Sequence, residues 1–194
     1  MLSRFFALVA LLCMMFVPAN GAATTPSGSA MRTIVNFDNG PDEPRWIAVN
    51  DGVMGGRSSG QPKIENGELT FSGELSLANN GGFASARSVG VNFDLSDAAT
   101  VVLRVRGDGR RYQLRLATDA DYRGVSISYG TEFETVADEW IEARLLLASL
   151  TPTVRGSPLG GPPLDASQVR EIGLLIADKH EGAFALSVDW IAVE

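Results

Sequence analysis

Residues 100–118, Thr-Val-Val-Leu-Arg-Val-Arg-Gly-Asp-Gly-Arg-Arg-Tyr-Gln-Leu-Arg-Leu-Ala-Thr, hold two runs of alternating apolar and polar side chains around Gly107-Asp108-Gly109. Alternation with a period of two is typical of a strand with one buried face. An Asp-Gly pair tolerates the positive φ of a tight turn. The stretch therefore predicts two strands, Thr100–Arg106 and Tyr112–Thr118, that pair as a hairpin.

In such a hairpin the apolar residues share one face, and the polar residues Arg104, Arg106, Gln113 and Arg115 share the other. Ser126, Ser128, Glu142 and Arg144 would extend this polar face on neighbouring strands. One interpretation is a solvated surface with cross-strand Arg–Glu pairs. The other is a binding face for an acidic saccharide or a protein carboxylate, since guanidinium groups bind carboxylates through two parallel hydrogen bonds.

The rest of the chain has the same rhythm, with short apolar or alternating runs broken by Gly, Pro, Asn and Asp. The other expected strands are Thr33–Phe37, Glu68–Leu75, Phe83–Ser88, Gly124–Tyr129, Trp140–Leu147, Glu171–Ala177 and Phe184–Val193. One short connecting helix is expected at Ala166–Arg170, where Asp165 can cap the first turn. The pattern predicts an all-β protein, an antiparallel β-sandwich or jelly roll with two sheets.

The N-terminal segment differs from the rest. A short basic start and an apolar run, Phe5–Val17, precede small residues, which predicts a signal peptide over residues 1–23. Residues 24–30 are expected to form a flexible lead-in, and residues 31–194 a single domain. The protein would then be exported, as a periplasmic or secreted protein. Two alternatives are an uncleaved N-terminal membrane anchor and lipid anchoring at Cys13, although Leu12 before Cys13 does not fit a lipoprotein signal.

Composition excludes several classes of function. A net charge of −7 and the lack of a basic run argue against nucleic-acid binding. The single His and the single Cys are too few for a three-histidine zinc site or a disulfide framework, and they argue against a Cys/His nucleophile. His180 lies in a polar turn, and the pairs Asp119/Asp121 and Asp94/Asp97 fit solvated loops. We therefore expect no catalytic residues, cofactor or metal, although an unrecognised hydrolase stays an alternative.

The stretch from Trp46 to Gly60, Trp-Ile-Ala-Val-Asn-Asp-Gly-Val-Met-Gly-Gly-Arg-Ser-Ser-Gly, is dense in glycine. It is not a Walker phosphate loop, because Asp51 stands where the first glycine belongs and Arg57 where the lysine belongs. Closely spaced glycines instead predict a loop that folds tightly against the sandwich, with Trp46, Val53 and Met54 as apolar plugs.

Two blocks, Asn50-Asp-Gly-Val-Met-Gly-Gly-Arg-Ser-Ser59 and Gly81-Gly-Phe-Ala-Ser-Ala-Arg87, resemble the complex I intermediate-associated protein 30 family. The resemblance runs over about residues 33–193 and includes the closing Phe184–Ile191 block. It implies a galactose-binding-domain-like β-sandwich. For the mitochondrial members it also implies a non-enzymatic role in assembling respiratory complex I, whereas an exported chain would meet only the opposite face of such a complex.

Within the resembling blocks, Asp51 is expected to cap its own loop or to bind a ligand, and Arg87 to pair with a carboxylate such as Asp51. The candidate binding residues are Trp46, Asn50, Asp51, Met54, Arg57, Ser58, Arg87, Arg104, Arg106 and Arg155.

Two binding functions follow. The first is an exported, non-enzymatic binding or assembly module with an unidentified protein partner, which contacts a membrane only through that partner or through an uncleaved N-terminal segment. The alternative is a carbohydrate-binding module of the bacterial envelope with a saccharide ligand. Aromatic side chains would stack on the sugar rings in that case. The candidate platforms are Trp46, Trp140, Tyr122 and Tyr129.

Overall fold

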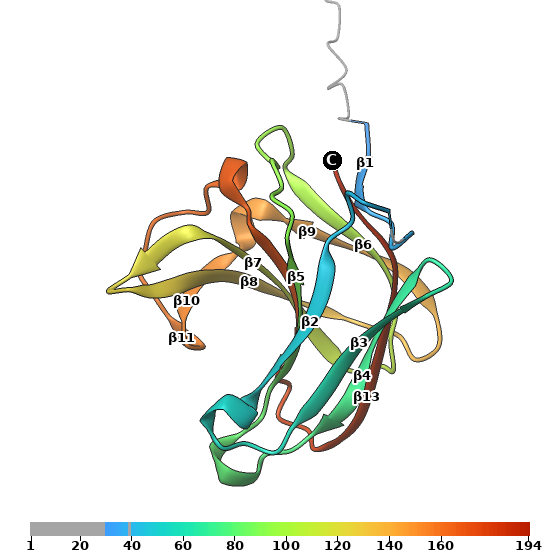
Figure 1. The fold of residues 1–194 in the computed structure, drawn as a ribbon, viewed down its shortest axis with the longest axis vertical. Coiled ribbons are helices and arrows are strands. Elements are labelled where there is room, and N and C mark those ends of the chain that lie inside the picture. Colours follow the sequence, from blue (N-terminus) through green and yellow to red (C-terminus); the bar gives the residue numbers. More distant parts are fainter. Residues whose placement is uncertain (1–29, 39) are drawn as a thin grey trace, which may run out of the picture.

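Two antiparallel sheets pack face to face in the computed structural model, which describes residues 30–38 and 40–194 (Figure 1). One sheet has six strands in the order β3-β4-β13-β6-β9, with β1 also paired to β13. Its strands are β1 (Arg32–Val35), β3 (Ser59–Glu65), β4 (Glu68–Leu75), β6 (Thr100–Arg106), β9 (Trp140–Leu146) and β13 (Gly182–Val193). The expected signal peptide, residues 1–23, and residues 24–29 of the expected lead-in lie outside the described residues.

The second sheet has seven strands in the order β11-β10-β8-β7-β12-β5-β2. Its strands are β2 (Arg45–Asn50), β5 (Ala84–Val89), β7 (Arg111–Tyr122), β8 (Val125–Glu134), β10 (Thr151–Val154), β11 (Ser157–Pro158) and β12 (Glu171–Ile176). The described helical structure consists of short 3-10 turns, η1 (Asp51–Met54), η2 (Ala78–Asn80), η3 (Leu147–Ser149) and η4 (Ala166–Gln168). The all-β prediction is confirmed, and the turn expected after Asp165 is η4, where the Asp165 side chain accepts from the Ser167 N–H.

The core lies between the two sheets, where alternate residues of each strand meet. On β7, Tyr112, Leu114 and Leu116 are fully buried, and on β6 Leu103 and Val105 face them from the other sheet. Each large aliphatic or aromatic side chain buried in this way contributes about 1.5–3 kcal/mol. No described helix is long and apolar enough to cross a membrane.

The predicted pairing of β6 with β7 is wrong. β6 pairs with β13 and β9, whereas β7 pairs with β12 and β8, so Gly107–Gly109 crosses from one sheet to the other. Asp108 holds this crossing, because its carboxylate accepts from Tyr112 Oη at 3.1 Å and from the Ala185 N–H on β13 at 2.9 Å. Alternation predicted correctly which side chains point inward, but two strands that face each other across a core alternate just as a hairpin does.

Four observed strands were not expected, namely β2, β3, β10 and β11. β2, β3 and β11 are the outermost strands of their sheets, and β3 contains Gly60 and Pro62. Proline is tolerated on an edge strand, since the N–H that it lacks would face away from the ladder. β3 therefore pairs with β4 although Gly60 and Pro62 are residues typical of a loop.

Candidate functional site

A buried carboxylate organises the glycine-rich loop. Asp51 is fully buried in η1, and its Oδ2 accepts from Ser58 Oγ at 2.6 Å and from the Gly82 N–H at 2.6 Å. Its Oδ1 accepts from the Ser58 N–H at 2.9 Å. Burial raises the pKa of Asp51, but the hydrogen bonds from Ser58, Gly82 and Phe83 outweigh it and hold the pKa below its usual range. Asp51 therefore joins the loop after β2 to the loop before β5.

Glycines make room for that carboxylate. A Cβ at Gly56 or at Gly81 would overlap the Asp51 side chain. A second link between the two loops comes from Asn79 Nδ2, which donates to the Gly55 carbonyl at 3.1 Å. The glycines thus leave room for the carboxylate of Asp51. Their spacing is explained by this contact within the chain, and no phosphate ligand is needed to explain it.

The joined loops expose three apolar side chains, Val53, Met54 and Leu77, which we call the apolar tip. Their exposed fractions are 77%, 66% and 41%. Val53 and Met54 were expected to be plugs in the core, and this expectation is wrong because Asp51 occupies the buried position of the loop. Figure 1 shows η1 and η2 close together at the end of the sandwich away from β1.

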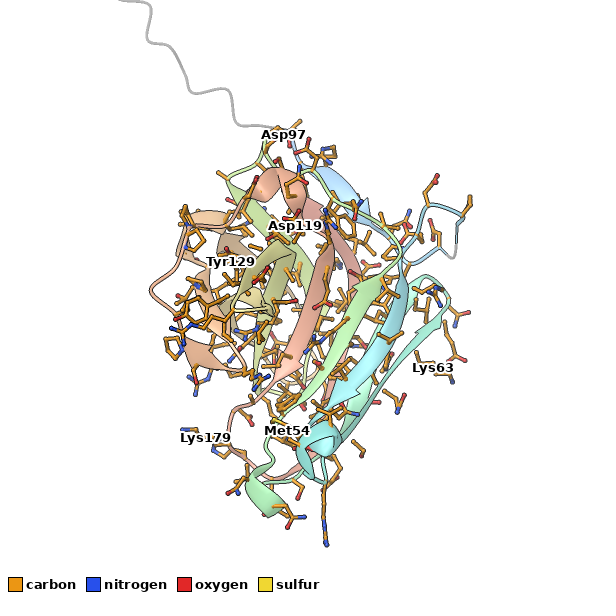
Figure 2. All side chains as sticks on the ribbon, turned by 60° about the vertical axis from the view of Figure 1, so that its left-hand side comes forward. Met54, Lys63, Asp97, Asp119, Tyr129 and Lys179 are labelled. Carbon is orange, nitrogen blue, oxygen red and sulfur yellow. The ribbon has the colours of Figure 1, made fainter. Side chains whose placement is uncertain are left out.

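The apolar tip borders a groove of about 1100 Å³ on the outer face of the seven-stranded sheet. Side chains of β5, β12, β7 and β8 that point away from the core line it, among them Arg87, Gln113, Arg115 and Ser128. Met54 and Lys179 both line the groove and are labelled near the lower end of the sandwich in Figure 2. The groove joins an apolar end to a polar floor.

The groove is basic although the protein carries a net charge of −7. Its charged lining residues are Arg87, Arg115, Arg155, Arg170, Lys179, Glu132 and Glu171. Burial lowers the pKa of Arg115, and nearby Arg87 lowers it further. Burial also raises the pKa of Glu171, against the pull of Arg87. An anion that enters this groove would meet more positive than negative charge.

The structure brings only some of the predicted site residues together. Met54, Arg87 and Arg155 line the groove, and Arg155 lies in the turn between β10 and β11 with a φ of 50°. Arg57 is exposed in the glycine-rich loop and does not line the groove, and Ser58 is buried with Asp51. Asn50 and Trp46 do not line the groove. Asn50 Nδ2 donates to the Gly60 carbonyl, and Trp46 packs against Phe37 with ring centroids 5.8 Å apart.

The expected ion pair between Arg87 and Asp51 is not formed. Asp51 accepts hydrogen bonds from Ser58 and from backbone N–H groups. Arg87 instead lies 3.6 Å from Glu171 and donates to Ser85 Oγ. Sequence reasoning could not find this partner, because Glu171 reaches Arg87 only through the pairing of β12 with β5.

The predicted polar face is divided between the two sides of the molecule. Arg104 and Arg106 lie on the six-stranded sheet, beside the Trp140 ring at 5.6 and 5.0 Å from its centroid. They pair there with Asp189 and Glu68. Gln113 and Arg115 lie in the groove on the other sheet. The sequence placed Arg115 on a possible binding face but not among the candidate binding residues. Leu77, Gly173 and Glu171, which also line the groove, were not expected there, and Leu77 lies in a loop where no strand pattern could indicate it.

The aromatic platforms expected for a saccharide lie outside the groove. Tyr129 is buried, Trp140 is covered by arginines, and Tyr122 lies beside Arg123. Phe83 is the aromatic residue in the described lining, which contains neither Trp nor Tyr. Residues 30–38 and 40–194 also contain no cluster of three or more His, Cys, Asp or Glu side chains placed to hold a metal ion.

The sequence model of the family described as Complex I intermediate-associated protein 30 (CIA30) matches residues 35–188. The mouse (Mus musculus) protein named "Complex I intermediate-associated protein 30, mitochondrial" is 26% identical over 189 residues. That alignment covers 84% of this chain and 56% of the mouse protein, so the chain spans about half the length of this curated relative.

Solved structures with a similar fold include the family 11 carbohydrate-binding module of the cellulase Lic26A-Cel5E of Clostridium thermocellum. It is 12% identical, with a TM-score of 0.63 over 86% of this chain and 96% of that one. The same kind of module from Clostridium thermocellum, in complex with a β-1,3-1,4-mixed-linked tetrasaccharide, gives a TM-score of 0.61 over 84% of this chain and 95% of that one, also at 12% identity. At this identity the likeness shows the fold alone, a galactose-binding-like jelly roll.

The expectation of an exported, periplasmic or secreted protein is wrong, because the curated relative is a mitochondrial protein. Residues 1–30 contain no Asp or Glu. A lack of acidic residues is also a property of mitochondrial targeting segments. Composition at the N-terminus therefore did not identify the compartment.

Proposed function

Because the chain belongs to the complex I intermediate-associated protein 30 family, we propose that it is a non-enzymatic binding module that assists the assembly of a respiratory or other membrane protein complex. It does so by docking a protein partner. The observation that carries this proposal is the apolar tip, in which Val53 is 77% and Met54 66% exposed on a loop fixed by Asp51.

The tip has the properties of a protein-docking site. Val53, Met54 and Leu77 come from two loops that Asp51 and Asn79 hold together, so their arrangement exists before a partner arrives. Burying one such side chain in an interface is worth about 1.5–3 kcal/mol. Little of that energy is spent on ordering a loop that is already fixed by hydrogen bonds.

The saccharide alternative has weaker support. Sugar-binding grooves use exposed aromatic rings as stacking platforms, and Phe83 is the only aromatic side chain in the described groove lining. The fold alone does not favour a sugar, since the same sandwich carries many unrelated functions.

The test is site-specific photo-crosslinking in the native host. A photo-reactive residue replaces Met54 in the full chain, and in a control replaces Lys63, an exposed residue of β3 on the other sheet. We expect position 54 to capture a defined set of membrane-complex subunits that position 63 does not capture. A second variant adds Val53→Ser to the chain that carries the photo-reactive residue at position 54. We expect the affinity for the partner, and with it the crosslinking yield, to fall at least about ten-fold, a loss of about 1.4 kcal/mol of binding free energy.

Equal capture from positions 54 and 63 would contradict the proposal, and so would recovery of no protein above background. If the protein instead binds cello- or mixed-linked oligosaccharides at millimolar concentration or tighter by calorimetry, the saccharide alternative replaces the assembly role.

A further inference from the structure

The Arg115 side chain on β7 lies across the neighbouring strand β8. Its cross-strand partner there is Gly130, and a Cβ on that residue would overlap the Arg115 side chain. Beyond Gly130, Arg115 Nη2 donates to Thr153 Oγ1 on β10 at 2.8 Å. The Thr153 hydroxyl donates in turn to the Ser128 carbonyl on β8 at 3.0 Å. Three neighbouring strands thus position one guanidinium group on the floor of the groove.

The orientation of this guanidinium group leaves one of its edges free. The Arg115 atoms nearest to an added Cβ on Gly130 are Nη1 and Cδ, which share one edge of the planar group. The opposite edge carries Nε and Nη2 and therefore faces away from β8. Thr153 takes one of the two Nη2 N–H groups, and no acceptor in residues 30–38 and 40–194 takes the Nε–H. The buried side-chain nitrogens without a partner in this part of the chain belong to other residues, so Nε of Arg115 is open to solvent.

Arg115 has no counter-charge of its own within the described part of the chain. The charged neighbour that acts on it is another cation, Arg87, which together with burial lowers the pKa of Arg115. The acidic side chains of the groove lie beside other arginines: Glu171 is 3.6 Å from Arg87, and Glu132 is 3.1 Å from Arg111. A bound anion would therefore stabilise the charged form of Arg115.

We propose that the free edge of Arg115 binds a carboxylate, and that this carboxylate is an Asp or Glu side chain of the protein partner. The inference rests on the proposed function and names the chemistry of the partner. Two parallel N–H groups on one edge of a guanidinium group match the two oxygens of a carboxylate. The excess of basic over acidic side chains in the groove lining would attract an acidic segment.

A uronic acid offers the same carboxylate, but a peptide fits this groove better. The described lining contains no Trp or Tyr on which a sugar ring could stack. The same lining includes Val53, Met54 and Leu77 of the apolar tip, which would pack against an apolar side chain. The partner segment would thus carry an acidic residue and an apolar residue.

The direct test follows the arginine Nε–Hε signals of the isotope-labelled full chain by NMR. Three probes are titrated separately: N-acetyl-glutamate methylamide, the neutral N-acetyl-glutamine methylamide, and D-glucuronate. We expect the glutamate probe to shift the Arg115 signal saturably and the glutamine probe to leave it in place. The variant Arg115→Lys assigns the signal, because it removes that Nε–H.

The variant Gly130→Ala tests the position of the guanidinium group without removing a charge. The three atoms nearest to the added Cβ all belong to the flexible Arg115 side chain, so the variant should fold with this side chain displaced. We expect the affinity for the glutamate probe to fall at least about ten-fold, a loss of about 1.4 kcal/mol. Gly160→Ala is the matched control: its Cβ enters open space outside the groove lining, and the probe should bind it like the unmodified protein.

The same two variants connect the site to the protein partner. Each is combined with the photo-reactive residue at position 54. We expect Gly130→Ala to lower the yield of captured protein at least about ten-fold and Gly160→Ala to leave it unchanged. If Gly130→Ala does not fold, as judged by its thermal midpoint, Arg115→Lys replaces it, since lysine keeps the charge but has no pair of parallel N–H groups.

Three results would overturn the inference: no Arg115 shift with the glutamate probe, a shift with glucuronate alone, or equal capture by Gly130→Ala and Gly160→Ala. The two proposals fail separately. Equal capture by the two glycine variants, together with no Arg115 shift, contradicts the carboxylate site and leaves the assembly role standing. A saturable Arg115 shift without any captured protein contradicts the assembly role, and with it the protein source of the carboxylate.

Discussion

Asp51 and Ser58 are joined by two hydrogen bonds, from Ser58 Oγ to Oδ2 at 2.6 Å and from the Ser58 N–H to Oδ1 at 2.9 Å. The same carboxylate accepts from the Gly82 N–H at 2.6 Å, so one buried side chain fixes both loops of the apolar tip. The residue that holds the surface is therefore hidden, while the residues that we propose to dock are exposed.

Asp51→Asn should destabilise the protein by about 2–3 kcal/mol, because the amide turns an acceptor into a donor and leaves buried N–H groups unpaired. Capture through position 54 should fall with it, since the loops of the tip are no longer fixed. Urea unfolding measures the free energy. The control Asp97→Asn breaks a solvent-exposed pair with Arg32 and should cost less than about 1 kcal/mol.

Asp51→Asn should also change the response to acid. The pKa of Asp51 is below its ordinary value of 3.8 in the folded protein. Its stabilisation is therefore present above about pH 4 and is lost as the pH falls through the folded pKa. The unmodified protein should lose more stability on acidification below pH 4 than the variant loses. Parallel acid profiles would contradict the role assigned to this carboxylate.

Asp178→Asn should cost about 3–5 kcal/mol, because it leaves the Arg110 guanidinium buried without its counter-charge. Arg110 donates to both Asp178 oxygens, at 2.7 and 2.9 Å, and the two side chains are only 14% and 4% exposed. Glu65→Gln is the matched control: its pair with Lys63 is equally short, 2.8 Å, but solvent-exposed, and it should cost less than about 1 kcal/mol. Equal urea midpoints for the two variants would contradict the assignment.

Tyr112 should make the protein sensitive to alkali. Burial and the neighbouring Asp108 raise the pKa of Tyr112 above its ordinary value of 10. A raised folded pKa gives stability that is present below about pH 10 and is lost as the pH rises further. Tyr112→Phe should flatten this alkaline loss, as measured by thermal midpoints against pH. Tyr122→Phe, at the exposed end of β7, should keep the slope of the unmodified protein.

Much of the fold was predictable from local patterns. β4 and β6 have the predicted bounds, and Tyr112, Leu114 and Leu116 lie in the core as their alternation indicates. The Asp-Gly-Val-Met-Gly-Gly and Gly-Gly-Phe-Ala-Ser-Ala-Arg blocks indicated the family, which the match over residues 35–188 confirms. Alternation succeeds because strand geometry is a property of the chain itself, with side chains on opposite faces at successive residues.

The edge strands, and which side chains of the glycine-rich loop are exposed, were less predictable. β3 contains Pro62 and Gly60 and was not expected as a strand, since nothing local shows that a neighbouring strand will pair with it. Val53 and Met54 are apolar and were placed in the core, although the charged Asp51 is the buried residue. A buried carboxylate can occupy that position only because Ser58 and Gly82, from two loops, supply its hydrogen bonds.

The sequence by itself determined that this protein is an all-β sandwich of one family, and which face of the alternating strands β6 and β7 turns inward. Only the tertiary structure decided that Arg104 and Arg115 lie on opposite sheets, that Arg87 meets Glu171 instead of Asp51, and that Arg115 lies over Gly130. The physical reason is the range of the interactions. Side-chain alternation follows from the bonded geometry of neighbouring residues. Strand pairing instead depends on contacts between residues that are dozens of positions apart, and many alternative pairings and registers look equally favourable from the local sequence.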